Sequence, residues 1–177
     1  RIKYFCQKEN MGSFKNFHFI LEKAKGEYFL FMAVDNYVDP TFLEKCINVL
    51  DTNQRVVGCI SQMAIDNQYE DNFLREKKLL EKIGLRFRPL NTISITGSYN
   101  TRIRKFLRNF QWGMFYSVFR REELMKSLGW DVMNGFDATM ILNMLKYGEI
   151  EVVNEILFYG FPNGDSSNGM IYLAKKY

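Results

Sequence analysis

Apolar and polar positions along this chain follow buried-strand and amphipathic-helix patterns in alternation. The uncharged runs at residues 28–34 and 56–65 are typical of strands inside a sheet. Between them, residues 39–50 carry apolar side chains at helical spacing behind an Asp-Pro start. This order of strand, helix and strand predicts an α/β fold with a mostly parallel sheet flanked by helices.

The rest of the chain continues the alternation. The pattern predicts further strands at residues 2–5, 113–119 and 149–161. It predicts further helices at residues 13–26, 72–84, 101–109, 121–129 and 134–148. Ser13 is the expected N-cap of the first helix and Gly26 its end. We expect residues 1–177 to form a single domain.

Asp35 stands directly after the predicted strand at residues 28–34. Ligands of α/β sheets gather at the carboxyl ends of the strands, so a carboxylate there is a candidate for binding a divalent cation or a ribose hydroxyl. Asp39, next to Pro40, is interpreted instead as a cap of the following helix. Asp35 is too far from the helix start to fill that role.

Asp137 is the second candidate. At about 100° per residue it falls on the same helical stripe as Met140, Ile141 and Met144. An acidic residue on an apolar stripe is unusual, because an unpaired buried charge is costly, and this suggests a general base that faces the sheet. The alternative interpretation is a first-turn Asp that the helix dipole stabilises.

Arg102, Arg104, Lys105 and Arg108 form a basic group within seven residues. They are either a solvated helix face or a contact with phosphate on an acceptor or with an anionic membrane surface. The net charge of +4 does not by itself indicate nucleic acid, and we expect no nucleic-acid partner. His18, the single histidine, is interpreted as structural, which leaves little material for a zinc cluster or a Ser-His-Asp triad.

The composition, 47% hydrophobic and 25% charged, is ordinary for a globular protein. The three cysteines have no CxxC spacing and fit a reducing cytosol. We therefore expect a cytoplasmic protein, at the inner face of the membrane if the basic group makes peripheral membrane contact. The sequence contains no apolar run long enough to span a bilayer.

Three stretches together resemble glycosyltransferase family 2, the inverting GT-A enzymes with a Rossmann-like fold that use nucleotide-diphosphate sugars. Residues 9–32 resemble the family's Asn-x-Gly stretch, its following helix and its Ala-x-Gly-Glu-Tyr strand. The matching residues are Asn10, Gly12, Asn16, Ala24, Gly26, Glu27 and Tyr28. Residues 113–124 resemble the acceptor-side strand, and residues 129–161 resemble the stretch that carries the catalytic base.

The resemblance implies roles for individual residues. Asn10, Gly12 and Asp35 would bind the donor, and Asp137 would take the proton from the acceptor hydroxyl. Asp35 matches the last Asp of the family's Asp-x-Asp motif and would hold Mg²⁺ or Mn²⁺ together with the diphosphate. Ala33 stands at the first position of that motif, so the metal site is degenerate.

The resemblance also implies a reaction. A sugar would pass from a nucleotide-diphosphate sugar to a hydroxyl of a saccharide or lipid-linked acceptor, with inversion, in the synthesis of cell-surface polysaccharide or glycan. Arg120 and Arg121, at the end of the acceptor-side strand, would contact the acceptor or a phosphate. The family's first two strands have no match, so we expect a domain truncated at its N-terminus.

Two alternatives stay open at this point. The loss of a carboxylate at Ala33 is compatible with a family member that no longer catalyses and acts as a sugar-binding, nucleotide-binding or interaction module. A nucleotidyltransferase with a similar sheet would make nucleotide sugars rather than consume them.

Overall fold

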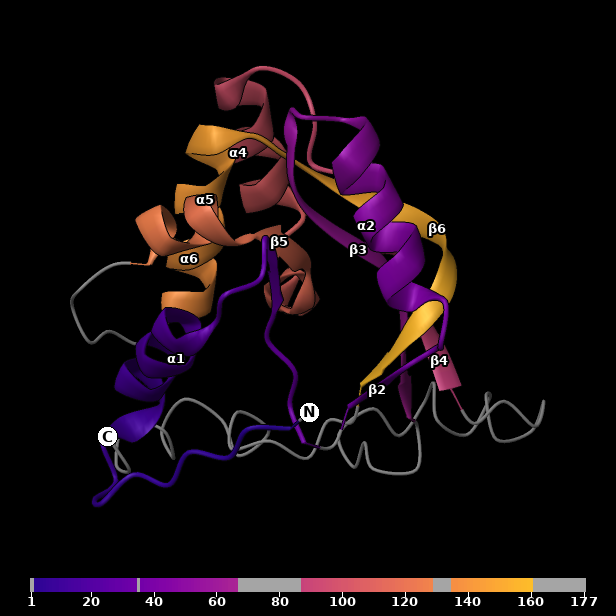
Figure 1. Ribbon diagram of the computed structural model, residues 1–177. Coiled ribbons are helices and arrows are strands. Elements are labelled where there is room, and N and C mark those ends of the chain that lie inside the picture. Colours follow the sequence, from indigo (N-terminus) through magenta and orange to yellow (C-terminus); the bar gives the residue numbers. More distant parts are fainter. Residues whose placement is uncertain (1, 35, 67–86, 129–134, 161–177) are drawn as a thin grey trace.

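The computed structural model describes residues 2–34, 36–66, 87–128 and 135–160 and shows a mixed α/β fold (Figure 1). Its helices are α1 (Gly12–Lys23), α2 (Phe42–Thr52), α4 (Tyr99–Arg108), α5 (Arg121–Ser127) and α6 (Phe136–Tyr147), with a 3₁₀ turn η2 (Trp112–Tyr116). Its strands are β1 (Tyr28–Leu30), β2 (Tyr37–Val38), β3 (Val56–Asp66), β4 (Phe87–Leu90), β5 (Val118–Arg120) and β6 (Glu149–Gly160).

The strands form one sheet in the order β1-β5-β3-β6-β2, with β4 also paired to β3. Among the described strands only β3 and β6 pair in parallel, and every other pairing is antiparallel. The expectation of a mostly parallel sheet is therefore wrong. The physical reason is β5, which runs opposite to both β1 and β3 and lies between them. β1 and β3 do run in the same direction, as the strand-helix-strand order predicts, but they are not neighbours.

The core has two halves, one on each face of the sheet. α2 covers one face, where its buried Phe42, Cys46 and Leu50 pack against side chains of β3 and β6. The other face is covered by α1, α4, α5, α6 and η2, which stand together on the left of Figure 1. Each layer buries its apolar side against the sheet, which is the usual way for such elements to form one core. No helix among the described residues is long and apolar enough to cross a membrane.

Most long, strongly periodic segments form the predicted elements. The strands predicted at 56–65 and 149–161 correspond to β3 and β6, and the predicted helices at 101–109, 121–129 and 134–148 correspond to α4, α5 and α6. The helix predicted at residues 72–84 lies outside the described residues.

Three short elements differ from the prediction. Residues 2–5 form no strand, and Ile2 is 95% exposed. The strand predicted at 28–34 is paired only over Tyr28–Leu30, because its partner β5 offers only three residues. The strand predicted at 113–119 begins instead with η2, and only Val118–Arg120 pair in the sheet.

The helix starts also differ in detail. The N-cap position of α1 is Met11 rather than Ser13, and no side chain caps it. Before α2, Asp39 Oδ1 accepts hydrogen bonds from the Thr41 N–H at 2.9 Å and from the Thr41 hydroxyl at 2.7 Å. These two bonds hold the pKa of Asp39 below its usual value. Asp39 thus fixes the turn before α2, but it is not the expected N-cap, because the N-cap position is Thr41 and the helix begins at Phe42.

Candidate active site

Aromatic rings join three segments that are far apart in the sequence. The ring of Phe17 in α1 has its centroid 5.1 Å from that of Phe31, after β1, and 5.0 Å from that of Phe136 in α6. It also lies 5.3 Å from the ring of Phe115 in η2, and Phe14 lies 6.0 Å from Phe136. Aromatic pairs at such distances stabilise a core beyond their buried area. The cluster therefore fixes the start of α1 near the start of α6, so that segments with predicted site residues lie close together.

Asn10 and Gly12 form a local turn before α1. Asn10 Oδ1 accepts a hydrogen bond from the Gly12 N–H at 2.9 Å. Gly12 has a φ of 78°, in the left-handed region, and a Cβ placed on it would meet nothing within 4 Å. The glycine is thus required by the backbone conformation and not by lack of space. Asn10 is exposed and uses its carbonyl oxygen in this turn, so its NH₂ group is not needed for it.

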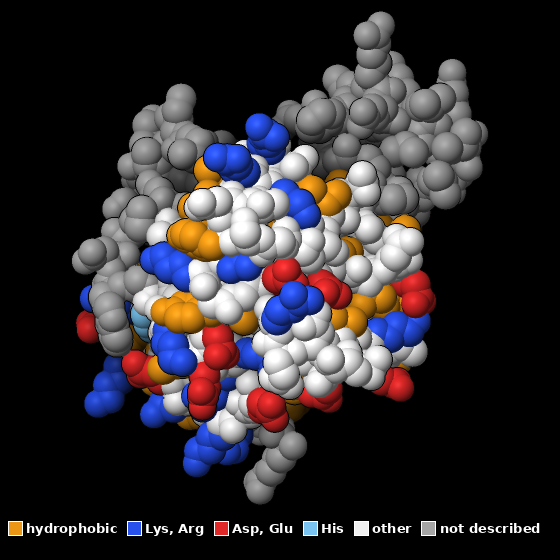
Figure 2. All heavy atoms as spheres, turned by 90° about the horizontal axis from the view of Figure 1, so that it is seen from above, with side chains coloured by type: hydrophobic (Ala, Val, Ile, Leu, Met, Phe, Trp, Pro, Cys, Tyr) orange, Lys and Arg blue, Asp and Glu red, His pale blue; other side chains and the backbone are white. Residues whose placement is uncertain are grey.

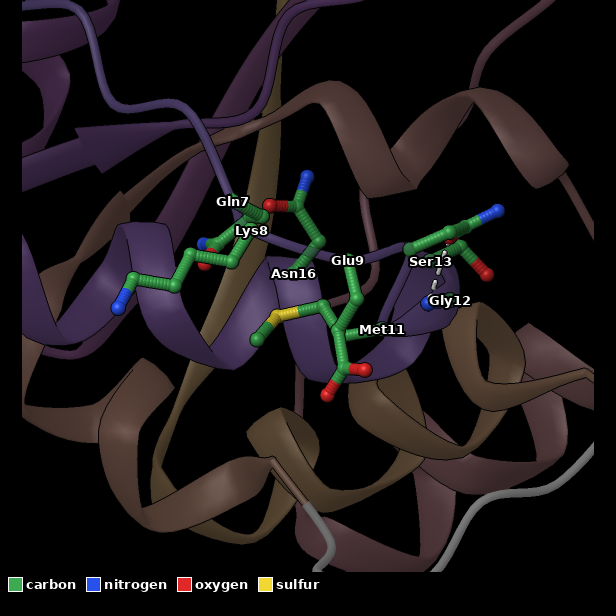
Figure 3. A pocket seen from close by; sticks show the side chains of 8 residues that line it. Gln7, Lys8, Glu9, Met11, Gly12, Ser13 and Asn16 are labelled. Atoms are coloured by element: carbon green, nitrogen blue, oxygen red, sulfur yellow. Dashed lines mark hydrogen bonds between the residues drawn. The ribbon is translucent and has the colours of Figure 1, made fainter.

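The same turn lines a hollow of about 480 Å³ at the start of α1 (Figure 3). Its lining residues are Gln7, Lys8, Glu9, Asn10, Met11, Gly12, Ser13 and Asn16. Gln7 Nε2 is buried and has no hydrogen-bond partner in the part of the chain that the structure describes. A buried donor without a partner is costly and calls for an acceptor from a ligand or from water. The lining carries one basic side chain, Lys8, and one acidic side chain, Glu9, so their charges offset each other. The buried Gln7 donor and the N-terminus of α1 are the features that suit the hollow to an anionic group.

Asp137 lies in the first turn of α6, directly after Phe136 of the aromatic cluster. Its side chain is half-buried, and Oδ1 accepts a hydrogen bond from the Ala138 N–H at 2.9 Å. Oδ2 makes no hydrogen bond to any described residue. The stripe predicted for this helix is present, since Met140, Ile141 and Met144 are all buried. Asp137 therefore combines the expected position on the stripe with the first-turn position of the alternative interpretation, and α6's N-terminus stabilises its negative charge.

Asp35 lies outside the described residues, whereas its neighbours are described. The Asn36 N–H donates to the Ala33 carbonyl at 3.2 Å. A cluster of three or more His, Cys, Asp or Glu side chains that would hold a metal ion does not occur among the described residues. Magnesium commonly binds through one or two carboxylates and the phosphates of its substrate, so a site built on Asp35 would not need such a cluster.

Arg120 and Arg121 lie elsewhere, where β1 begins and β5 ends. Arg120 Nε donates to the Val56 carbonyl at 2.9 Å, and Nη2 donates to the Leu50 carbonyl. Arg121 Nε donates to the Gly26 carbonyl at 2.9 Å. These bonds tie both guanidinium groups to the main chain. The structure does not bring the two arginines to the hollow at the start of α1.

The predictions from sequence did not include two residues with functional features. Gln7 carries the buried, unpartnered donor, and a sequence pattern contains no signal for a missing partner. Trp112 is 44% exposed, and its indole lies near Gly160 at the end of β6. A Cβ added to Gly160 would stand 3.7 Å from Trp112 Cη2 and also 3.7 Å from Asn36 Oδ1. The sequence does not show that Trp112 is exposed, so it gave little reason to choose this residue. Its place near the end of β6 is known only from the fold.

The structure shows an α/β protein with a hollow at the start of α1 and a half-buried carboxylate, Asp137, at the start of α6. Its sequence matches the family described as Glycosyl transferase family 2 over residues 1–110. Because this match spans more than half of the 177 residues, the chain belongs to glycosyl transferase family 2 and is a glycosyltransferase of some kind. Comparison with curated proteins gives no match. The matched range contains Asn10, Gly12 and Asp35 but not Asp137.

Proposed function

We propose that the chain is the catalytic part of an inverting GT-A glycosyltransferase. It would transfer a sugar from a nucleotide-diphosphate sugar to a hydroxyl of a saccharide or lipid-linked acceptor, in the synthesis of a cell-surface glycan. The observation that carries the proposal is the junction of the starts of α1 and α6. The hollow with its unpartnered Gln7 donor and the half-buried Asp137 carboxylate belong to helices joined through the ring of Phe136.

The diphosphate of the donor is the group that the hollow suits best. Gln7 Nε2 and the Asn10 NH₂ group supply hydrogen-bond donors, and the positive charge of Lys8 is offset by the Glu9 carboxylate in the same lining. Hydrogen bonds from such groups to charged oxygens are among the stronger ones in proteins. The N-terminus of α1 adds the partial charge that favours phosphate at helix starts.

Asp137 is proposed as the general base. As the acceptor oxygen forms its bond to the anomeric carbon, the hydroxyl proton passes to the Asp137 carboxylate. The bond between the anomeric carbon and the diphosphate oxygen breaks, and the nucleoside diphosphate leaves with that electron pair. Oδ2, which has no partner among the described residues, is the oxygen that would take the proton.

Trp112 is proposed as the wall of the acceptor site. Its exposed indole and the Asn36 side chain, which follows Asp35 in the sequence, both lie near Gly160. The Trp112 ring also packs edge-on against Tyr116 at 6.3 Å. A rigid, partly exposed aromatic ring offers apolar area for one face of a sugar ring at little cost in side-chain entropy.

A divalent cation is part of the proposal through Asp35. When bound, Mg²⁺ or Mn²⁺ would neutralise charge on the leaving diphosphate. Asp35 would supply one carboxylate, and the diphosphate would supply further oxygens. Chelation with excess EDTA should then raise the KM for the donor, and added Mg²⁺ should restore it. Unchanged donor KM in EDTA would remove the metal from the proposal.

The decisive experiment replaces Asp137 by Asn in the full-length protein and measures the release of nucleoside diphosphate from a panel of UDP-, GDP- and dTDP-sugars with acceptor present. We expect kcat to fall by about 100-fold to 10,000-fold, the range that a positioned general base contributes. The donor KM should stay the same, because the carboxylate acts on the acceptor. Asp39→Asn is the matched control, since that side chain serves only the turn before α2 and its amide oxygen still accepts from Thr41.

Other outcomes would point to the alternatives. If kcat of Asp137→Asn stays within about threefold of the wild type, the base assignment is wrong. If the wild type binds donor without any turnover over the whole panel, the binding-module alternative replaces the enzyme. Release of pyrophosphate from a nucleoside triphosphate and a sugar phosphate would identify a nucleotidyltransferase instead.

A further inference from the structure

The outer face of α4 combines exposed cations with exposed apolar side chains. Arg104, Leu107 and Arg108 lie three and four positions apart, so they share one face of the helix. Leu107 is 63% exposed, and Phe110, just after the helix, is 53% exposed. The opposite side of α4 is anchored in the core by Phe106, which is 1% exposed. The Phe110 ring also packs edge-on against Phe106 at 5.4 Å, so the core holds this exposed ring in place. The helix therefore presents a fixed, largely exposed surface.

The four basic residues of this segment fall into two pairs with different surroundings. Arg102 donates to the Leu145 carbonyl at 2.8 Å and 3.1 Å, where it caps the end of α6. Lys105 donates to the Thr96 hydroxyl at 3.1 Å. Arg104 and Arg108 are exposed and make no hydrogen bond or ion pair with any described residue. The first pair is structural, and only the second pair is available to a partner.

The stretch of sequence that contains α4 is basic. Residues 82–121 contain no Asp or Glu. Of the basic residues in this stretch, Arg104 and Arg108 are the exposed ones on α4, whereas Arg120 and Arg121 are bound to main-chain carbonyls at the end of β5. In Figure 2, which looks onto the end of the molecule where α4 lies in Figure 1, Lys and Arg side chains stand beside hydrophobic ones in the upper part of the described surface. A partner for this region is therefore expected to carry negative charge.

We propose that the face formed by Arg104, Leu107, Arg108 and Phe110 binds the surface of an anionic lipid bilayer. Basic side chains near such a surface are attracted to its lipid phosphates. Leu107 and Phe110 enter the boundary between headgroups and acyl chains, which is how a helix that lies on a membrane buries its apolar side. An aqueous polyanion such as nucleic acid would satisfy the arginines but would leave the two apolar side chains without a hydrophobic partner.

The test is cosedimentation of the full-length protein with vesicles, without donor or acceptor. Vesicles of phosphatidylcholine with an increasing fraction of phosphatidylglycerol should bind the protein increasingly, and pure phosphatidylcholine should bind it weakly. Raising NaCl should release it, because the attraction is screened. Replacing both arginines by Gln should weaken binding about fivefold for each residue, the factor that corresponds to about 1 kcal/mol per basic side chain. Leu107→Ser should weaken binding to the same vesicles at unchanged charge.

The matched control is Lys15→Gln combined with Lys25→Gln. It removes two positive charges from exposed positions in and just after α1, and its binding should equal that of the wild type. Equal losses in both double variants would show a non-specific charge effect and would overturn the proposal. Absence of wild-type binding to anionic vesicles would overturn it as well, and so would binding to single-stranded DNA that anionic vesicles do not displace. None of these readouts depends on glycosyl transfer, so this proposal and the proposed function succeed or fail separately.

Discussion

Two regions of the molecule differ in whether their polar side chains find hydrogen-bond partners within the protein. Where β1 begins, Arg120 donates its hydrogen bonds to main-chain carbonyls, and the Tyr28 hydroxyl donates to the Asp51 carboxylate. Before the start of α1, Gln7 Nε2 is buried and has no partner among the described residues. Polar groups that are satisfied internally stabilise the fold, whereas buried polar groups that are left over mark a place for a ligand.

Glycines in the two regions show the same difference. A Cβ on Gly148, beside the start of β3, would stand 2.3 Å from the Arg55 carbonyl oxygen. Gly12 and Gly135, at the starts of α1 and α6, have φ values of 78° and 79°, and a Cβ there would meet nothing within 4 Å. Gly148 is required for packing, and the other two are required for backbone conformation. The surroundings of Gly148 are thus tightly packed, whereas the starts of α1 and α6 are open.

The largest effect on stability should come from Gly148→Ala. The new methyl group would collide with main-chain atoms, which cannot rotate away, so the free energy of unfolding should fall by about 3 kcal/mol. Gly12→Ala should cost only about 1 kcal/mol, the strain of a left-handed conformation at Ala. Urea unfolding of both variants measures the difference. Equal losses would contradict the division between a packed region and an open one.

Arg120→Gln should be next. Removal of the guanidinium leaves the Val56 and Leu50 carbonyls without their donors, which should lower the unfolding free energy by about 2 kcal/mol. The KM values for donor and acceptor should not change, because the side chain does not reach the hollow. A variant with wild-type stability and a raised KM would instead support the contact with phosphate or acceptor that the resemblance predicts.

Gln7→Leu should have the opposite effects: unchanged stability and a raised donor KM. Replacing a buried, unpartnered amide by an apolar group of similar size should leave stability unchanged or slightly higher. It should raise the donor KM about tenfold, as expected for the loss of one hydrogen bond to a charged oxygen. Gln62→Leu is a useful contrast, because Gln62 exchanges hydrogen bonds with Thr92 and its loss should affect stability alone. If Gln7→Leu destabilises the protein without changing the donor KM, the hollow is not the donor site.

The sequence predicted most of the elements but not their neighbours in the sheet. Long periodic segments such as those of β3, β6 and α6 carry their structure in the local pattern. The antiparallel position of β5 between β1 and β3 depends on long-range pairing, which a local pattern does not contain.

The candidate site was predictable to a similar extent. Asp137 stood out because a carboxylate on an apolar stripe contradicts the local pattern, and functional residues often do so. Gln7 did not stand out, because its significance depends on a hydrogen-bond partner that the fold fails to provide. The family resemblance implied that Arg120 contacts the acceptor or a phosphate, but the fold supplies main-chain carbonyls to its guanidinium group.

The smallest effect should come from Tyr28→Phe, in the region where polar groups are satisfied. Partial burial, followed by the hydrogen bond and charge of Asp51, raises the pKa of Tyr28 to about 12 from the usual 10.0. A raised pKa in the folded state means that the stabilising contribution of the hydroxyl is fully present below pH 10 and is lost between pH 10 and about 12. Wild type should therefore exceed Tyr28→Phe by at most about 1 kcal/mol at pH 8, and the gap should close as the pH approaches 12. Urea unfolding of both proteins at pH 8, 10 and 11.5 (values chosen around the usual tyrosine pKa of about 10) measures this difference in unfolding free energy.

Because both proteins contain the same other tyrosines, a difference that stays constant over this range would show that the hydroxyl is not coupled to Asp51. The region around Tyr28 would then differ from the hollow at the start of α1 in its packing alone.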